Sequence, residues 1–174
     1  LTLPILEKAI DDLVAKGEID PLSGICLVDD GSRDGTWALI EKRGAGQANV
    51  SGIRLATNFG QQAALLAGLH TAKGDLILTI DADLQDDIGI LPQMIAAWKA
   101  GAQIVFGVRG TRSGDGRLKR LGAHLFYKTM KLLGARSIPQ HSDFRLMTRL
   151  AVEALRGYGE TNLYLRGLIA NMGF

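Results

Sequence analysis

Two aspartates separated by one residue, Asp81 and Asp83, directly follow an apolar run at residues 76–80. A continuous apolar run of this length is typical of a strand buried on both faces of a sheet. Open α/β sheets bind their ligands at the carboxyl ends of such strands. Side chains two apart on an extended chain point the same way, so both carboxylates can face one cation. Mg²⁺ or Mn²⁺ held by one or two carboxylates is completed by water and substrate phosphates, so this pair indicates a metal–diphosphate site.

Two alternatives to this interpretation are a solvated acidic loop and a calcium-binding loop. A calcium loop that starts at Asp81 fails, because Asp86 stands where such a loop needs glycine and Pro92 where it needs glutamate. A second segment, residues 30–41, does match the EF-hand ligand positions. An EF-hand loop is entered from a helix, however, and a short strand-like apolar run precedes this segment. The calcium interpretation is therefore the weaker one.

The composition fits one globular domain. The chain has 174 residues, 47% of them hydrophobic, and a net charge of +2. That charge is too small to indicate nucleic-acid binding from bulk electrostatics. The single cysteine, Cys26, excludes an internal disulfide and is predicted to be a buried thiol, because it lies within an apolar run. No apolar run reaches the roughly 18 residues of a membrane-spanning helix.

The elements that position the aspartates alternate along the chain. Strands are predicted at residues 25–28, 50–55, 76–80 and 103–108, and helices at residues 3–15, 37–42, 61–72 and 90–99. The first of these strands ends at Asp29 and Asp30, so it also carries acidic residues at its carboxyl end. Alternation with short connections predicts an α/β fold with a mainly parallel sheet and helices on both faces.

The composition changes after Arg109. A polar loop at 111–116 precedes a helical pattern at 117–133, in which basic residues form a stripe beside an apolar half. The stripe comprises Arg117, Arg120, His124, Lys128 and Lys131. Such a helix suits an anionic membrane surface, and the alternative is an ordinary surface helix with a solvated cationic face. A short strand at 143–147 and helices at 149–156 and 162–172 complete the prediction.

Four segments in order resemble family 2 glycosyltransferases, most closely the branch that acts on polyprenyl phosphates, such as dolichol-phosphate mannosyltransferases and bactoprenol glucosyltransferases. They are Val-Asp-Asp-Gly-Ser-Arg-Asp-Gly-Thr at 28–36, Asn-Phe-Gly-Gln-Gln-Ala-Ala-Leu at 58–65, Asp-Ala-Asp-Leu-Gln-Asp at 81–86 and Ser-Asp-Phe-Arg-Leu at 142–146. The resemblance covers essentially the whole chain. It implies a GT-A (Rossmann-like) fold, a UDP- or GDP-linked sugar donor and a divalent cation, Mg²⁺ or Mn²⁺.

The resemblance also implies roles for individual residues. Asp29 and Asp30 would lie at the nucleoside, and Asp81, Ala82 and Gln85 would line the donor site. Asp83, with Asp81, would hold the metal. Asp83 and Asp143 would be the catalytic residues, and Arg109 would face the acceptor side together with Asp143. Arg117 and Arg120, from the basic stripe, are further candidates for acceptor binding.

By the same resemblance, residues 1–174 form a single domain, with a nucleotide-sugar part at 1–108 and an acceptor part at 109–174. Family members usually begin with a further strand and end with membrane helices, so the chain is expected to be truncated at both ends, and the activity of the partial chain is in question. The full-length protein is expected to be anchored at the cytoplasmic face of the plasma membrane, with a homo-oligomer as one expected state.

The expected reaction is inverting transfer to a polyprenyl phosphate, whose oxygen is already anionic. Asp143 would then orient the acceptor or a basic side chain. A saccharide hydroxyl as acceptor would instead need a general base, and Asp143 is the candidate. A purely structural ion pair of Asp143 with Arg145 or Arg149 is the third alternative. A nucleotidyltransferase is disfavoured, because no glycine-rich phosphate loop with a lysine occurs, whereas a non-catalytic nucleotide-binding module remains an alternative.

Overall fold

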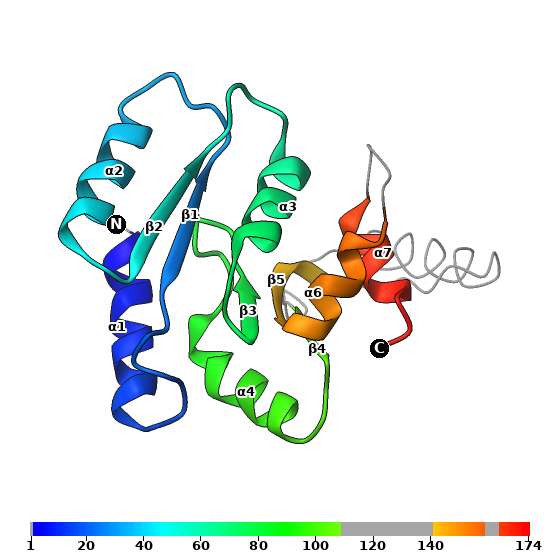
Figure 1. The fold of residues 1–174 in the computed structure, drawn as a ribbon. Coiled ribbons are helices and arrows are strands. Elements are labelled where there is room, and N and C mark those ends of the chain that lie inside the picture. Colours follow the sequence, from blue (N-terminus) through cyan, green and yellow to red (C-terminus); the bar gives the residue numbers. More distant parts are fainter. Residues whose placement is uncertain (1, 109–140, 159–163) are drawn as a thin grey trace, which may run out of the picture.

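The computed structural model describes residues 2–108, 141–158 and 164–174 (Figure 1). The helices are α1 (Thr2–Ala15), α2 (Thr36–Gly46), α3 (Gln61–Thr71), the short 3₁₀ helix η1 (Ile88–Ile90), α4 (Leu91–Lys99), α6 (Arg149–Arg156) and α7 (Leu165–Asn171). The strands are β1 (Ile25–Asp29), β2 (Val50–Arg54), β3 (Leu76–Thr79), β4 (Ile104–Val108) and β5 (His141–Thr148). Arg109, Arg117, Arg120 and the predicted basic helix at 117–133 lie outside the described residues. Within the described ranges, no helix is both long and apolar enough to cross a membrane.

The strands form two sheets. β1 and β2 pair in parallel, from Ile25 opposite Val50 to Asp29 opposite Arg54. The second sheet has the order β3–β5–β4, and β5 runs antiparallel to both neighbours. The predicted α/β class is confirmed, and β1 and β2 pair in parallel as expected. The described strands do not form one mainly parallel sheet, however, because β5 runs antiparallel to β3 and β4. The sheet differs from a simple βαβ succession in that β5, the last strand in sequence, lies between β3 and β4.

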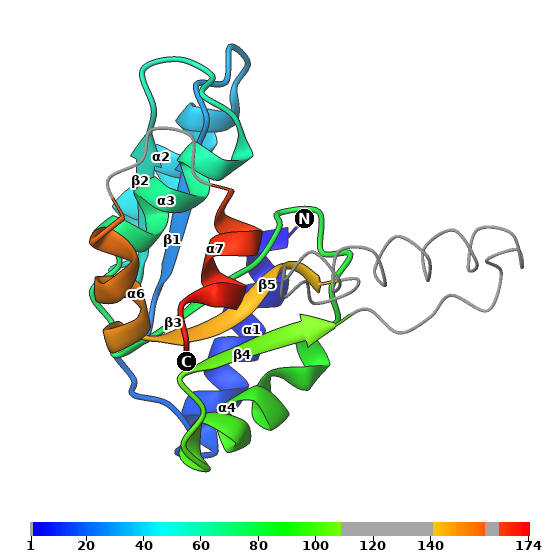
Figure 2. The ribbon, with the colours of Figure 1, turned by 90° about the vertical axis from the view of Figure 1, so that its right-hand side faces the viewer.

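β5 has a different environment on each face, because alternate side chains of a strand point to opposite sides. Phe144 and Leu146 pack with residues of α1 and α4. Met147 packs on the other side with α3, α6 and α7, and Figure 2 shows α7 in front of this sheet. Asp143 and Arg145 share the side of Met147. The predicted helical cover on both faces is therefore present, and the two charged residues lie under α3 and α7.

The predicted burial of Cys26 is wrong, because this thiol is exposed. Helix α3 packs over the carboxyl end of β1, where a Cβ added to Gly68 would lie 3.1 Å from the side chain of Val28. Cys26 points to the same side of the strand as Val28 but lies two residues earlier, beyond this contact. An apolar run thus predicts the strand correctly without fixing how far the covering helix extends along it.

Candidate functional site

The carboxylate of Asp29 is buried at the carboxyl end of β1, with 4% of the residue exposed. One oxygen, Oδ1, accepts a hydrogen bond from the backbone N–H of Ser32 at 3.2 Å. The other, Oδ2, lies 3.7 Å from Nε of Arg54 and has no hydrogen-bond partner among the described residues. A buried carboxylate oxygen without a donor is costly unless a ligand supplies one. Asp29 is therefore suited to accept an N–H or O–H group of a ligand.

The carboxylate of Asp30, unlike that of Asp29, has hydrogen-bond donors on both oxygens. Its two carboxylate oxygens accept hydrogen bonds from the backbone N–H groups of Phe59 and Gly60, each at 2.8 Å. These bonds fix the loop that enters α3, where Gly60 has a φ of 91°. Because both oxygens are used inside the protein, this geometry assigns Asp30 to loop positioning, and direct nucleoside binding by Asp30 stays a prediction.

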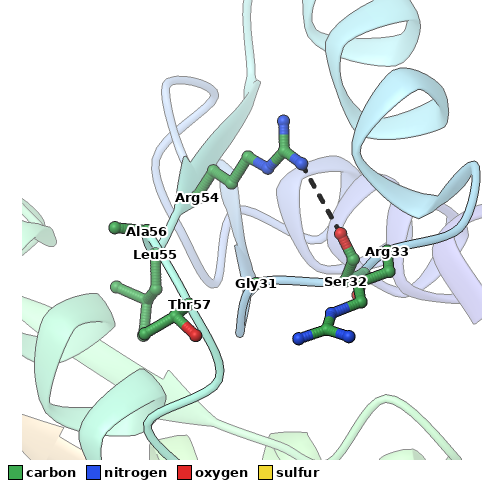
Figure 3. A pocket seen from close by; sticks show the side chains of 7 residues that line it. All are labelled: Gly31, Ser32, Arg33, Arg54, Leu55, Ala56 and Thr57. Carbon is green, nitrogen blue, oxygen red and sulfur yellow. Dashed lines mark hydrogen bonds between the residues drawn. The ribbon is translucent and has the colours of Figure 1, made fainter.

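A pocket of about 670 Å³ lies beside Asp29, between the segment 31–33 and the segment 54–57 (Figure 3). Gly31, with a φ of 68°, allows the two segments to approach, because an added Cβ would lie 2.4 Å from the backbone of Thr57. Arg33 and Arg54 line the pocket, and Arg54 also lies over the ring of Trp37 at 5.8 Å. Two guanidinium groups give the pocket a positive charge that suits an anionic ligand.

Asp81 and Asp83 follow β3 in a turn, so the expectation that extended chain aligns their two side chains is wrong. The N–H of Leu84 bonds the carbonyl of Asp81 at 3.3 Å, and Leu84 has a φ of 52°. Oδ1 of Asp83 accepts from the N–H of Gln85 at 3.1 Å, and the carbonyl of Ala82 accepts from the Thr2 hydroxyl at 2.6 Å. The structure thus places the predicted donor-site residues on one turn, with Asp83 exposed to solvent.

Negative charge accumulates around Asp81. Burial raises the pKa of its carboxyl, and Asp143, Asp83 and Asp86 raise it further, while a hydrogen bond from Gln61 opposes the shift. No group of three or more His, Cys, Asp or Glu side chains in the described part of the chain could hold a metal alone. Mg²⁺ and Mn²⁺ do not require such a group, because substrate phosphates supply further oxygens. Asp81 and Asp83 fit this type of site, where a cation would relieve the repulsion.

The raised pKa of Asp81 gives a stability prediction for the metal-free protein. Between the ordinary value of 3.8 and its raised value, the folded state binds more protons than the unfolded state. The contribution of Asp81 to stability therefore falls as the pH rises through this window. We expect Asp81→Asn to be more stable than the parent at neutral pH, with a difference that shrinks as the pH falls through the window. Urea unfolding in a chelator at several pH values measures this.

The matched control for this prediction is Asp12→Asn, which removes a carboxylate from the exposed face of α1. The stability difference between Asp12→Asn and the parent should not change with pH as it does for Asp81→Asn. A difference for Asp81→Asn that is the same at every pH, or a variant that is less stable than the parent at neutral pH, contradicts the electrostatic origin.

Asp143, at 1% exposure, accepts hydrogen bonds on both carboxylate oxygens. Oδ1 accepts from Nη2 of Arg145 and, at 3.2 Å, from Nε of Arg166. Oδ2 accepts from Nη2 of Arg166 at 2.9 Å and from Nε2 of Gln61 at 3.0 Å. The same Gln61 nitrogen donates to Oδ1 of Asp81 at 2.9 Å, so one amide bridges the two carboxylates.

The ion pair with Arg145 matches the structural alternative for Asp143. Arg149, the other predicted partner, instead donates to the carbonyls of Ala72 and Gly74. Arg145 is fully buried, and burial lowers its pKa although Asp143 opposes this. The bridge from Gln61 goes beyond a structural pair, because it joins Asp143 to Asp81. The two hydrogen bonds from Arg166 also connect Asp143 to α7.

Sequence reasoning did not identify Gln61 and Arg166 as site residues. Gln61 lies in the segment 58–65, so its place in a family motif was an available signal. Arg166 had no such signal, because it stands in an ordinary helical pattern 23 residues after the carboxylate it binds. Only the packing of α7 against β5 brings these two groups together.

Comparison with known proteins gives concordant matches. The model of the family described as "Glycosyl transferase family 2" matches residues 3–156. An uncharacterised glycosyltransferase of Bacillus subtilis (strain 168), YkoT, is 46% identical over 171 residues, which are 97% of this chain and 51% of that protein. The bactoprenol glucosyl transferase of Shigella phage SfV is 40% identical over 173 residues, 98% of this chain and 55% of its own length.

A prophage bactoprenol glucosyl transferase homolog of Escherichia coli (strain K12) is 41% identical over 150 residues, which cover 86% of this chain and 49% of that protein. The chain thus spans about half the length of the curated relatives it matches.

Proposed function

The chain belongs to glycosyl transferase family 2, and from this membership we propose that the whole protein transfers a sugar from a nucleotide-sugar donor to a polyprenyl phosphate. The relatives named as bactoprenol glucosyl transferases support this branch of the family. The acceptor is then a lipid, so the reaction takes place at a membrane surface, for which we propose the cytoplasmic face. The predicted basic helix at 117–133, with Arg109, Arg117 and Arg120, is proposed to contribute to the acceptor side.

The environment of Asp143 favours a phosphate acceptor over a saccharide hydroxyl. A saccharide hydroxyl must lose a proton on attack, so its transfer needs a base with a free oxygen lone pair within reach. Both oxygens of Asp143 already accept from Arg145, Arg166 and Gln61. A phosphate acceptor arrives with an anionic oxygen and needs no such base. The bonding of Asp143 therefore supports a phosphate acceptor and a role for Asp143 in orienting a basic side chain.

On the donor side, three carboxylates with different surroundings support the proposed assignments. Asp29 has a buried oxygen that can accept a hydrogen bond from a nucleobase or ribose. Asp81 and Asp83 lie together on the turn after β3, where they would hold Mg²⁺ or Mn²⁺ with the donor diphosphate. The cation would supply stabilisation of the negative charge that develops on the leaving diphosphate.

The proposed reaction needs no proton transfer. An oxygen of the acceptor phosphate forms a bond to the anomeric carbon while the bond from that carbon to the diphosphate oxygen breaks. The electron pair of the broken bond leaves with the nucleoside diphosphate, and attack from the opposite side inverts the anomeric configuration. Gln61 holds Asp81 and Asp143 at a fixed separation, so that the donor and acceptor sides keep their alignment.

We expect Asp29→Ala to weaken the binding of a nucleoside diphosphate about 10-fold or more, because it removes a buried charged acceptor worth roughly 1.5–3 kcal/mol. Binding of inorganic diphosphate and the dependence on Mn²⁺ should stay unchanged. Isothermal titration of both ligands with and without Mn²⁺ measures these effects. Asp20→Asn, at an exposed turn before β1, serves as the control. Equal losses for both ligands would contradict a nucleoside-specific role.

A screen of nucleotide sugars against the full-length protein tests the function itself. Membranes or micelles supply a polyprenyl phosphate, and mass spectrometry identifies a glycosylated lipid phosphate. Formation of that product supports the proposal. Transfer to a saccharide hydroxyl, with none to the lipid phosphate, would favour the alternative glycosyltransferase. Nucleotide binding without turnover of any donor would favour a non-catalytic module.

A further inference from the structure

Arg166 is a cation of this site that solvent can reach. Its side chain is 36% exposed, whereas the side chain of Arg145, the other guanidinium group bound to Asp143, is 0% exposed. A ligand that approaches Asp143 can therefore contact Arg166 but not Arg145. The hydrogen bond to Asp143 raises the pKa of Arg166, so its charge is retained.

One edge of the Arg166 guanidinium group binds Asp143, through Nε at 3.2 Å and Nη2 at 2.9 Å. Nη1 has no acceptor in the part of the chain that the structure describes. The guanidinium plane is oriented by a buried carboxylate, and its geometry suits phosphate oxygens as well as carboxylate oxygens. The remaining edge is therefore preorganised for a second anion.

The helix that carries Arg166 is itself held against the donor side. The side-chain oxygen of Gln62, on α3, accepts from the N–H of Leu165, the first residue of α7, at 3.2 Å. The adjacent Gln61 donates to Asp81 and Asp143. Two neighbouring side chains of α3 thus contact the start of α7, Asp81 after β3, and Asp143 in β5.

Charge explains why an anionic acceptor needs this group. Three carboxylates, those of Asp81, Asp83 and Asp86, lie in the short segment 81–86, and Gln61 bridges Asp81 to Asp143. A phosphate that enters beside them is repelled, unless a cation accompanies it or lies in its path. We propose that Arg166 binds the phosphate of the lipid acceptor and that Asp143 positions Arg166 for this contact. This inference rests on the proposed function and names the residue that receives its acceptor.

The test compares Arg166→Gln and Arg166→Lys with the parent, as full-length protein in detergent micelles. We expect Arg166→Gln to raise the KM for a polyprenyl phosphate by about 10–100-fold, the loss that follows from a charged hydrogen bond of roughly 1.5–3 kcal/mol. The KM for the nucleotide sugar should change less than about threefold, within the usual scatter of such contributions. Arg166→Lys should recover part of the loss, because it keeps the charge without the fork.

Arg43→Gln is the matched control, since Arg43 is 43% exposed and pairs with Glu7 at 2.5 Å on a remote surface. It should leave both KM values unchanged. An acceptor KM that stays at the parental value in Arg166→Gln overturns the inference, and so does an equal rise in both KM values.

A binding measurement separates failure of this inference from failure of the proposed function. Titration with a short-chain polyprenyl phosphate, and with the corresponding polyprenol, reports recognition of the phosphate without turnover. We expect the parent to prefer the phosphate and Arg166→Gln to lose that preference while it still binds nucleoside diphosphate. A parent without this preference would overturn the proposed acceptor. A variant that retains the parental preference would overturn the role of Arg166 alone.

Discussion

Asp143→Asn is expected to destabilise the fold by about 3–5 kcal/mol, because it removes the charge that compensates a buried arginine. The side chains of Asp143 and Arg145 are 2% and 0% exposed, so water cannot replace the lost interaction. Two further donor atoms of Arg145, Nε and Nη1, already lack partners among the described residues. Chemical unfolding, followed by circular dichroism, gives the difference in the free energy of unfolding.

The control for this prediction is Glu153→Gln, which breaks the exposed ion pair with Arg156 on α6. Surface pairs contribute roughly 0–1 kcal/mol, so the control should change little. The double variant Asp143→Leu with Arg145→Met should be more stable than Asp143→Asn alone, because well-packed apolar residues can replace a buried ion pair with little loss. A single variant that loses less than about 1 kcal/mol would show that Arg145 does not depend on this carboxylate.

Asp83→Asn is expected to lower the turnover of the full-length protein by at least about 100-fold, because it removes an anionic ligand of a cation worth several kcal/mol of charge stabilisation. The fold should stay intact, since Asp83 is exposed on the turn after β3. Nucleoside diphosphate binding should lose its enhancement by Mn²⁺. Titrations with and without Mn²⁺, together with initial rates, measure both effects.

Asp75→Asn is the matched control for Asp83, because it removes an exposed carboxylate just before the start of β3, at the end away from the turn. Its turnover and Mn²⁺ dependence should equal those of the parent. An Asp83→Asn protein whose nucleotide affinity still rises with Mn²⁺ to the parental extent would contradict the assignment of Asp83 as a metal ligand.

Local sequence patterns determined much of the secondary structure and the family. The helix predicted at residues 3–15 is observed as Thr2–Ala15, and the strand predicted at 76–80 as Leu76–Thr79. Both depend on patterns within a few residues: helical spacing in one case and a short apolar run in the other. The four ordered motifs also led to the family that the comparisons confirm. The aspartates at the carboxyl ends of β1 and β3 were found for the same reason, since strand and carboxylates are adjacent in sequence.

Only the tertiary structure decided how strands pair and which side chains meet. The position of β5 between β3 and β4 depends on contacts across long stretches of chain, which no local pattern encodes. The exposure of Cys26 likewise depends on where α3 ends over β1. Asp30 and Asp29 are neighbours with equal chemistry, yet the fold engages both oxygens of Asp30 in backbone hydrogen bonds and leaves one oxygen of Asp29 without a donor.

The candidate site depends on both local sequence patterns and tertiary packing. The sequence by itself determined that Asp81, Asp83 and Asp143 are candidates, because their types and the strands around them are local properties. The tertiary structure decided that Gln61, 82 residues before Asp143, bridges Asp143 to Asp81. It also decided that Arg166, on α7, donates hydrogen bonds to Asp143. The physical reason is that a buried carboxylate requires donors from whichever elements pack over it, and that packing is settled only when the whole chain folds.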